Sequence, residues 1–148
     1  MVDCPHVRYP SAEDEDAWRK LWASYNAFYE TSVAAEVTAH TWRRILDPTT
    51  SMFGRLAIAD QDVVGFTVNV IHEGTWTTSR ICYLEDLFVD PSWRRKGIGR
   101  LLIQDLVELA GTNGWSRLYW HTRANNQARS LYDEFVKADD FVRYRLIF

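Results

Sequence analysis

The chain has 148 residues, of which 47% are hydrophobic and 25% are charged, and its net charge at neutral pH is −3. This length and composition predict one domain over residues 1–148 with a core of its own. The weak negative charge gives no reason to expect a nucleic-acid partner. Neither a signal sequence nor an apolar run long enough for a membrane span is visible, so we expect a cytoplasmic protein without a membrane partner. Cys4 and Cys82 lack metal-ligand spacing, and no metal site is expected.

Apolar periodicity and turn residues divide the chain into alternating strands and helices. The expected elements are, in chain order, a strand at His6–Pro10, helices at about Ala12–Tyr29 and Glu36–Leu46, strands at about Phe53–Ala59, Val63–Ile71 and Arg80–Val89, a helix from about Gly97 to Ala110, a strand at Ser116–Thr122, a helix at Asn125–Phe135 and a last strand at Phe141–Phe148. The order β-α-α-β-β-β-α-β-α-β predicts an α/β fold with helices on both faces of a mixed, largely antiparallel sheet of six to seven strands.

A basic turn separates the strand that ends at Val89 from the helix that begins near Gly97. Its sequence is RRKGIG, residues 94–99. A helix N-terminus has unpaired N–H groups and a partial positive charge, and glycines let the backbone approach a ligand, so the turn suits a phosphate group. The alternative is a solvated basic turn that only caps the helix. A dinucleotide fingerprint is excluded because Leu102 stands where it needs a third glycine, and a P-loop because Lys96 precedes the glycine.

The order Arg-x-x-Gly-x-Gly resembles the acetyl-CoA pyrophosphate loop of the GNAT superfamily of N-acetyltransferases. Downstream, NNQARSLY matches the Asn-x-x-Ala-x-x-Leu-Tyr motif of the family at Asn125, Ala128, Leu131 and Tyr132. The stretches YLEDLFV, WRKLWASYNAFYE and YWHT look like the small histone/polyamine acetyltransferase branch. Many members have a glycine where this chain has Val136, so the turn into the last strand is expected to differ from the family pattern.

The resemblance implies an enzyme, an N-acetyltransferase that uses acetyl-CoA as acyl donor and lets an amine attack the thioester directly. It further implies that a bulge near Phe88 and Val89 frees a backbone N–H for the thioester oxygen, and that Tyr132 protonates the CoA thiolate. The residues expected to contact the cofactor are Phe88, Val89, Arg94, Arg95, Lys96, Gly97, Ile98, Gly99, Arg100, Asn125 and Tyr132.

Two acids at the end of the long strand, Glu85 and Asp86, are candidates for receiving the amine proton. An alkyl amine with a pKa near 10.4 costs about 4.6 kcal/mol to deprotonate at pH 7, so a nearby carboxylate would assist. Glu85 is the first candidate and Asp86 the second, and alternation along a strand puts them on opposite faces. A salt bridge at the strand end is the alternative reading. His72 and His121 are weaker candidates for the base.

The acceptor side is expected to combine Tyr29, Glu30, Glu85 and Asp86, which predicts a cationic primary amine: a polyamine, an amino acid or a lysine side chain. The aromatic residues Tyr25, Phe28 and Tyr29 can equally frame an amino acid or a small aromatic amine. Two other function classes stay open, a non-catalytic acyl-CoA-binding module of the same fold and an unrelated nucleotide-binding enzyme. A homodimer or higher homo-oligomer is an option that the sequence does not decide.

Overall fold

The computed structural model describes residues 4–148, whose strands form one five-stranded sheet in the order β1-β2-β3-β4-β5. The strands are β1 (His6–Arg8), β2 (Met52–Ala59), β3 (Asp62–His72), β4 (Ile81–Val89) and β5 (Arg117–Tyr119). The first four are antiparallel to their neighbours, whereas β5 joins β4 in parallel. The expected mixed, largely antiparallel sheet is therefore confirmed.

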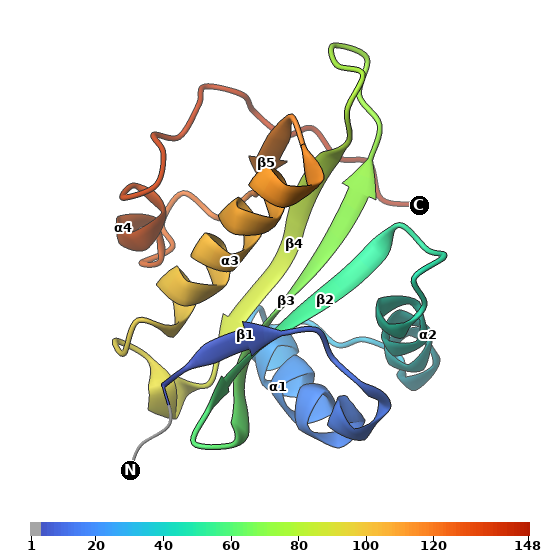
Figure 1. The fold of residues 1–148 in the computed structure, drawn as a ribbon, viewed down its shortest axis with the longest axis vertical. Coiled ribbons are helices and arrows are strands. Elements are labelled where there is room, and N and C mark those ends of the chain that lie inside the picture. Colours follow the sequence, from blue (N-terminus) through green and yellow to red (C-terminus); the bar gives the residue numbers. More distant parts are fainter. Residues whose placement is uncertain (1–3) are drawn as a thin grey trace.

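The helices occupy both faces of this sheet, as expected. They are α1 (Glu15–Phe28), α2 (Ala35–Leu46), α3 (Ile98–Asn113) and α4 (Arg129–Tyr132), with short 3-10 helices at Ala12–Asp14 (η1) and Pro91–Trp93 (η2). In Figure 1, α3 lies across one face of the sheet while α1 and α2 lie on the other. No helix within residues 4–148 combines the length and apolarity that crossing a membrane would require.

The expectation of six to seven strands is wrong, since the sheet of the described residues has five. The predicted last strand, Phe141–Phe148, is coil with exposed side chains, and no strand within residues 4–148 pairs with it. The helix predicted at Asn125–Phe135 contracts to the single turn of α4. There the Asn126 side chain accepts a hydrogen bond from the Ala128 N–H at 2.9 Å, an Asx turn that competes with helical hydrogen bonding.

Side-chain alternation along the strands creates one apolar core on each face. The core toward α1 and α2 contains Phe66, Val68 and Phe88 with Trp18 and Trp42, whose rings stack at 5.1 Å. The core toward α3 contains Ala57, Ala59, Val64, Ile98 and Leu102. Two helices on one face and one on the other thus bury both sides of the central strands.

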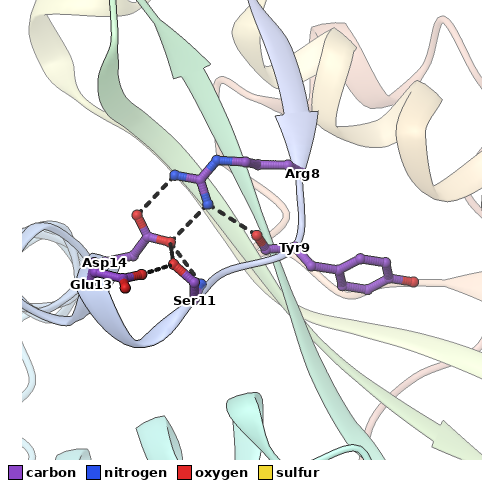
Figure 2. A network of polar contacts seen from close by, with 5 residues as sticks. All are labelled: Arg8, Tyr9, Ser11, Glu13 and Asp14. Carbon is purple, nitrogen blue, oxygen red and sulfur yellow. Dashed lines mark hydrogen bonds and ion pairs between the residues drawn. The ribbon is translucent and has the colours of Figure 1, made fainter.

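Two local features fix the pairing of β2 with β3 and the position of α1 beside β1. Asp60 and Gln61 both adopt positive φ, 50° and 69°, which is the geometry of the tight hairpin turn expected between β2 and β3. Figure 2 shows the start of α1, where Arg8 donates to both carboxylate oxygens of Asp14 at 2.8 and 2.9 Å and the Ser11 N–H donates to the same carboxylate at 2.7 Å. This network ties β1 to the N-terminus of α1.

Candidate active site

The basic turn leads into α3 through strained backbone. Gly97 is the N-cap with φ +82°, and Arg95 is left-handed with φ +61°. The N–H groups of the first residues of α3 have no intrahelical acceptor, because the preceding turn lies outside the helix. Gly99 lies at a close approach of α3 to α4, since a Cβ there would stand 3.1 Å from Leu131 Cδ2. The turn therefore presents backbone donors on an open surface.

The cations of this turn have no carboxylate partner among residues 4–148. The Arg94 guanidinium lies over the rings of Phe28 and Phe88, at 5.6 and 5.4 Å, and its Nε donates to the Val89 carbonyl at 3.3 Å. Lys96 Nζ lies 4.7 Å from the centre of the Trp93 ring. Arg100, by contrast, is held by Glu134 at 2.6 Å. Three positive charges thus remain available to an anion beside the start of α3.

The strands β4 and β5 pair over only three positions, from Ile81↔Arg117 to Tyr83↔Tyr119. Beyond Tyr83, the side of β4 that faces away from β3 has no strand partner among the described residues. Asp90 N–H donates to the Val64 carbonyl of β3 at 2.8 Å, and N–H direction alternates along a strand, so the Val89 N–H points to this open side. The Phe88 N–H points toward β3 by the same rule.

A register shift interrupts the pairing of β3 with β4, and it falls at Glu85. Asp86 pairs with Val68 while Leu84 pairs with Asn69, so Glu85 is the extra residue. The resemblance implied a bulge near Phe88 and Val89; the described irregularity lies three positions earlier. Asp86 and Phe88 lie two positions apart and share the α1 face, whereas the Glu85 side chain is exposed.

Asp86 meets α1 through Tyr25, whose hydroxyl donates to the Asp86 carboxylate at 2.7 Å. Burial raises the pKa of Asp86 to about 6; the Tyr25 hydrogen bond opposes this rise and the neighbouring Glu85 charge adds to it. Burial and the Asp86 charge also raise the pKa of Tyr25, so its hydroxyl stays a donor. The sequence suggested Tyr25 only as part of an aromatic frame. Its helical spacing from Tyr29 was a signal, but no sequence pattern pairs it with Asp86.

Aromatic rings connect Asp86 to α4. Tyr25 and Tyr29 contact at 5.0 Å, and the Arg123 guanidinium lies 5.6 Å from the centre of the Tyr29 ring. Tyr132 contacts Trp120 at 5.6 Å. Burial, with a smaller effect of the nearby Tyr29 hydroxyl, raises the pKa of Tyr132 to about 12, so its phenol is protonated at neutral pH. Residues from α1, β4 and α4 therefore lie near one another around Tyr25 and Tyr29.

The structure does not bring every predicted residue into this group. The Ile98 side chain is buried in the core under α3, which leaves only its backbone for a ligand. Glu30 is exposed with φ +54°, and Asn125 is exposed as well. His72 and His121 hydrogen-bond to Tyr119 and Tyr83, at 2.8 and 3.2 Å, near the other end of β4. Within residues 4–148, no cluster of three His, Cys, Asp or Glu side chains could hold a metal ion.

Comparison with known proteins agrees with this geometry. Residues 15–135 match the sequence profile of the acetyltransferase (GNAT) family. The D-amino-acid N-acetyltransferase HPA3 of Saccharomyces cerevisiae is 35% identical over 142 residues, which cover 94% of this chain and 88% of that protein.

Two solved structures share the fold. One is the ribosomal-protein-alanine N-acetyltransferase of Brucella melitensis biovar Abortus 2308, with a TM-score of 0.83 and 22% identity over 99% of this chain and 100% of that one. The other is AAC(6')-Iy in complex with the bisubstrate analogue CoA-S-monomethyl-acetylneamine, with a TM-score of 0.79 and 19% identity over 99% of this chain and 100% of that one.

Proposed function

Because the chain belongs to the acetyltransferase (GNAT) family, it is an acetyl-CoA-dependent N-acetyltransferase, and we propose that it acetylates the primary amine of a free amino acid. The observation that carries this proposal is the mixed charge around Tyr25 and Tyr29. The Asp86 carboxylate accepts a hydrogen bond from Tyr25, and the Arg123 guanidinium lies 5.6 Å from the centre of the adjoining Tyr29 ring. An amino acid carries a cationic amine and an anionic carboxylate, and it suits such a pair. The activity for which the yeast relative is named, D-amino-acid N-acetylation, supports the same acceptor class.

The donor would be held at the start of α3. The pyrophosphate of acetyl-CoA is proposed to accept hydrogen bonds from the N–H groups that follow Gly97, with Arg94, Arg95 and Lys96 supplying charge around it. Gly97 is suited to this role because a residue at φ +82° without a Cβ leaves space for the phosphate. The pantetheine arm would then run along the open side of β4 toward Tyr132.

The amine must lose a proton before it attacks, at a cost of about 4.6 kcal/mol at pH 7 for an alkyl amine. We propose Asp86 as the acceptor of this proton, directly or through one water molecule. Its pKa of about 6 lies near neutrality, where a base is both ionised and basic enough to be effective. Glu85, the first candidate from the sequence, is exposed at the register shift and is proposed to attract the cationic amine.

The remaining steps follow from the charge that develops on the thioester. The free amine attacks the carbonyl carbon, and the Val89 N–H is proposed to stabilise the negative oxygen, an effect typically worth about 2.7–4 kcal/mol for one preorganised donor. The carbon–sulfur bond then breaks and the CoA thiolate takes the phenolic proton of Tyr132. Asp86, which has released the first amine proton to solvent, takes the excess amine proton, and Tyr132 regains a proton from solvent. Tyr132 can serve because its raised pKa keeps it protonated until the thiolate forms.

An acceptor panel tests the proposal. CoA release is measured with acetyl-CoA and D- and L-amino acids, their methyl esters, spermidine and a lysine-rich peptide. Free amino acids are expected to give the highest kcat/KM, and the methyl esters, which keep the amine but lack the carboxylate charge, are expected to be poorer. A higher kcat/KM for spermidine or the peptide would contradict the proposed acceptor class.

The substitution Arg123→Gln tests whether Arg123 binds the carboxylate of the amino-acid acceptor. It is expected to raise KM for amino acids about 10-fold or more, because a hydrogen bond between charged groups contributes about 1.5–3 kcal/mol, and to leave KM for methyl esters unchanged. Arg117→Gln is the matched control, since Arg117 also lies over a tyrosine ring, Tyr119 at 4.9 Å, but on β5 away from Tyr29. An equal effect of both substitutions, or of Arg123→Gln on both acceptors, would argue against carboxylate recognition.

A further inference from the structure

A pocket of about 400 Å³ lies between α1, α2 and the loop that joins them. This volume falls within the roughly 300–1,000 Å³ of small-molecule sites. The α1 residues that line the pocket include Arg19, Asn26 and Ala27, which lie roughly 100–200° around the helix from Tyr25. Tyr25 donates to Asp86, so the pocket opens on a different side of α1 from the proposed active site.

Asn26 lines this pocket although it is only 9% exposed. Its backbone carbonyl accepts the Thr31 N–H at 2.9 Å, but within residues 4–148 its side-chain amide has no hydrogen-bond partner. A buried amide without a partner lowers stability, and such groups are rare in folded proteins. Because Asn26 lines the pocket, a bound molecule can supply the partner that the chain does not.

The end of α1 holds the loop beside this amide. Glu30 has φ +54°, and its N–H donates to the Ala27 carbonyl at 3.0 Å. Together with the bond from Thr31 to the Asn26 carbonyl, this is the Schellman motif that ends many helices. Thr31 and Ser32 thereby line the same pocket as Asn26. Neither of their hydroxyls has a hydrogen-bond partner among the described residues.

The other polar groups of the pocket are mainly hydrogen-bond donors. Arg19 donates to Glu15 through Nε at 2.9 Å, which leaves the two terminal amino groups of its guanidinium. This ion pair is half-exposed, so it holds Arg19 only weakly. Thr38 Oγ1 accepts the indole N–H of Trp22 at 3.1 Å and keeps its own proton to donate. No Asp or Glu of the described chain lines the pocket, which therefore suits a carboxylate and not a cationic amine.

We propose that this pocket binds an N-acetylated amino acid, the product of the proposed reaction. Arg19 and the loop hydroxyls would bind its carboxylate. Its secondary amide has one N–H and one carbonyl, and the Asn26 amide offers a matching acceptor and donor. The acetyl methyl and the side chain would lie against the apolar part of the lining, which includes Trp22 and Val33.

The free amino acid is a poor ligand for the same pocket. It has no secondary amide for Asn26, and its cationic amine would find no carboxylate in the lining. Calling the ligand the product rests on the proposed function. The chemistry that selects it, a carboxylate next to a neutral amide, rests on the pocket alone.

Protein NMR with N-acetyl-leucine, in its D and L forms, tests the site. CoA and leucine are added in excess to fill the proposed active site. N-acetyl-leucine is then expected to shift the side-chain amide signal of Asn26 and the indole N–H signal of Trp22, whereas CoA and leucine alone leave both unchanged. N-acetyl-leucine methyl ester, which lacks the carboxylate charge, is expected to bind about 10-fold or more weakly.

Two results of this titration would overturn the proposal. One is a set of shifts confined to the surroundings of Asp86 and Tyr132, and the other is equal binding of leucine and N-acetyl-leucine at Asn26. The acceptor panel decides the proposed function separately. If no free amino acid were acetylated while N-acetyl-leucine still shifted the Asn26 signal, the pocket would be supported and only its link to the product would be lost.

Substitutions in α1 locate the contact. Arg19→Gln is expected to raise the Kd of N-acetyl-leucine about 10-fold and to keep the fold, because Arg19 is half-exposed. Asn26→Asp keeps the shape of the side chain but puts a negative charge beside the ligand carboxylate, and it should weaken binding at least as much. Lys20→Gln is the matched control, since it removes the same charge from the next residue of α1, outside the pocket, and should leave the Kd unchanged. An equal rise of the Kd in Arg19→Gln and Lys20→Gln would overturn the proposal.

Discussion

At Asp86, burial and one tyrosine hydroxyl decide the protonation of a carboxylate. The Asp86 side chain is half-buried on the α1 face, where loss of water raises its pKa to about 6 against the opposing hydrogen bond from Tyr25. The adjacent Glu85 belongs to the same strand but is exposed, and it is the extra residue at the register shift. The two neighbouring acids thus differ in burial, and the pH dependence of kcat/KM can test this difference.

We expect kcat/KM of the wild type to rise as pH increases through about 6, since Asp86 must be ionised to accept a proton. Asp86→Asn should lower kcat by about 10²–10⁴-fold and remove that limb of the pH profile. Glu85→Gln is the matched control and should keep the limb at the same pH. The reverse pattern, with the limb lost in Glu85→Gln and kept in Asp86→Asn, would identify Glu85 as the base.

The same substitution has a predicted effect on stability. A folded-state pKa raised above the ordinary 3.8 means that stability is fully present below pH 3.8 and is lost as pH rises through about 6. Asn resembles the protonated acid, so Asp86→Asn should raise the free energy of unfolding at pH 7.5 by roughly 1–2 kcal/mol, and by little at pH 4. Urea unfolding at the two pH values measures this difference. A variant less stable than the wild type at pH 7.5 would contradict it.

Tyr132 is predicted to act on the leaving thiolate. Tyr132→Phe removes the phenolic proton but keeps the ring against Trp120, so kcat should fall about 100-fold or more while KM for acetyl-CoA changes little. An acetyl thioester of a more acidic thiol should restore much of the lost rate, because such a thiolate leaves without a proton. Tyr119→Phe is the control and should leave kcat unchanged. If Tyr132→Phe lowered kcat equally with acetyl-CoA and with the thioester of the more acidic thiol, Tyr132 would have no role in protonating the thiolate.

At the scale of elements, the start of α3 is the part of the fold that we propose for donor binding. Left-handed backbone at Gly97 forms the N-cap of the helix, and the first N–H groups of α3 are left without intrahelical acceptors. Gly99 allows α4 to approach α3, since a Cβ at this position would stand 3.1 Å from Leu131 Cδ2. The two glycines have different tasks, one conformational and one steric.

Gly97→Ala and Gly114→Ala together distinguish an effect on acetyl-CoA binding from an effect of backbone strain. Both glycines cap α3 in left-handed backbone, with φ +82° and +68°, and an added Cβ meets no atom within 4 Å at either. Each substitution should therefore cost about 1–2 kcal/mol of stability from backbone strain. Only Gly97→Ala should raise KM for acetyl-CoA, by about 10-fold. Equal KM values for the two variants would remove the start of α3 from the donor site.

At the scale of the whole molecule, ion pairs hold the helices of both layers to the sheet. Arg55 of β2 binds Asp105 of α3 through two bonds of 2.8 Å, and both side chains are largely buried. On the other side, Asp14 joins Arg8 of β1 to the start of α1 (Figure 2). The Arg8 hydrogen bond lowers the pKa of Asp14 to about 2, although burial opposes it.

The free energy of unfolding, measured as pH is lowered, should reveal the contribution of the Asp14 hydrogen bonds to stability. A depressed pKa gives stability that is present above about 3.8 and is lost as pH falls through about 2. Asp14→Asn should therefore lower the free energy of unfolding at pH 6 by about 1–2 kcal/mol, a range that allows for water around Arg8, and the difference should vanish near pH 2. Glu13→Gln is the control and should change little, because Glu13 is exposed. A difference that persists near pH 2 would assign the effect to something other than charge.

The sequence by itself determined the family, the succession of helices and strands as far as β5, and the position of the basic turn between a strand and a helix. These are local properties: helical periodicity placed α1, α2 and α3, tight-turn residues placed the β2–β3 hairpin, and RRKGIG and NNQARSLY are short contiguous motifs. The sequence also singled out Asp86 and Tyr132 by position in such motifs.

The tertiary structure decided what depends on contacts between distant residues. The Tyr25–Asp86 hydrogen bond spans 61 positions, and the register shift at Glu85 is a property of two strands rather than one. The same reason explains the wrong prediction at Phe141–Phe148. The pattern there specifies a strand, but a strand forms only beside a partner edge, and none of the five strands in the described part of the chain pairs with this segment.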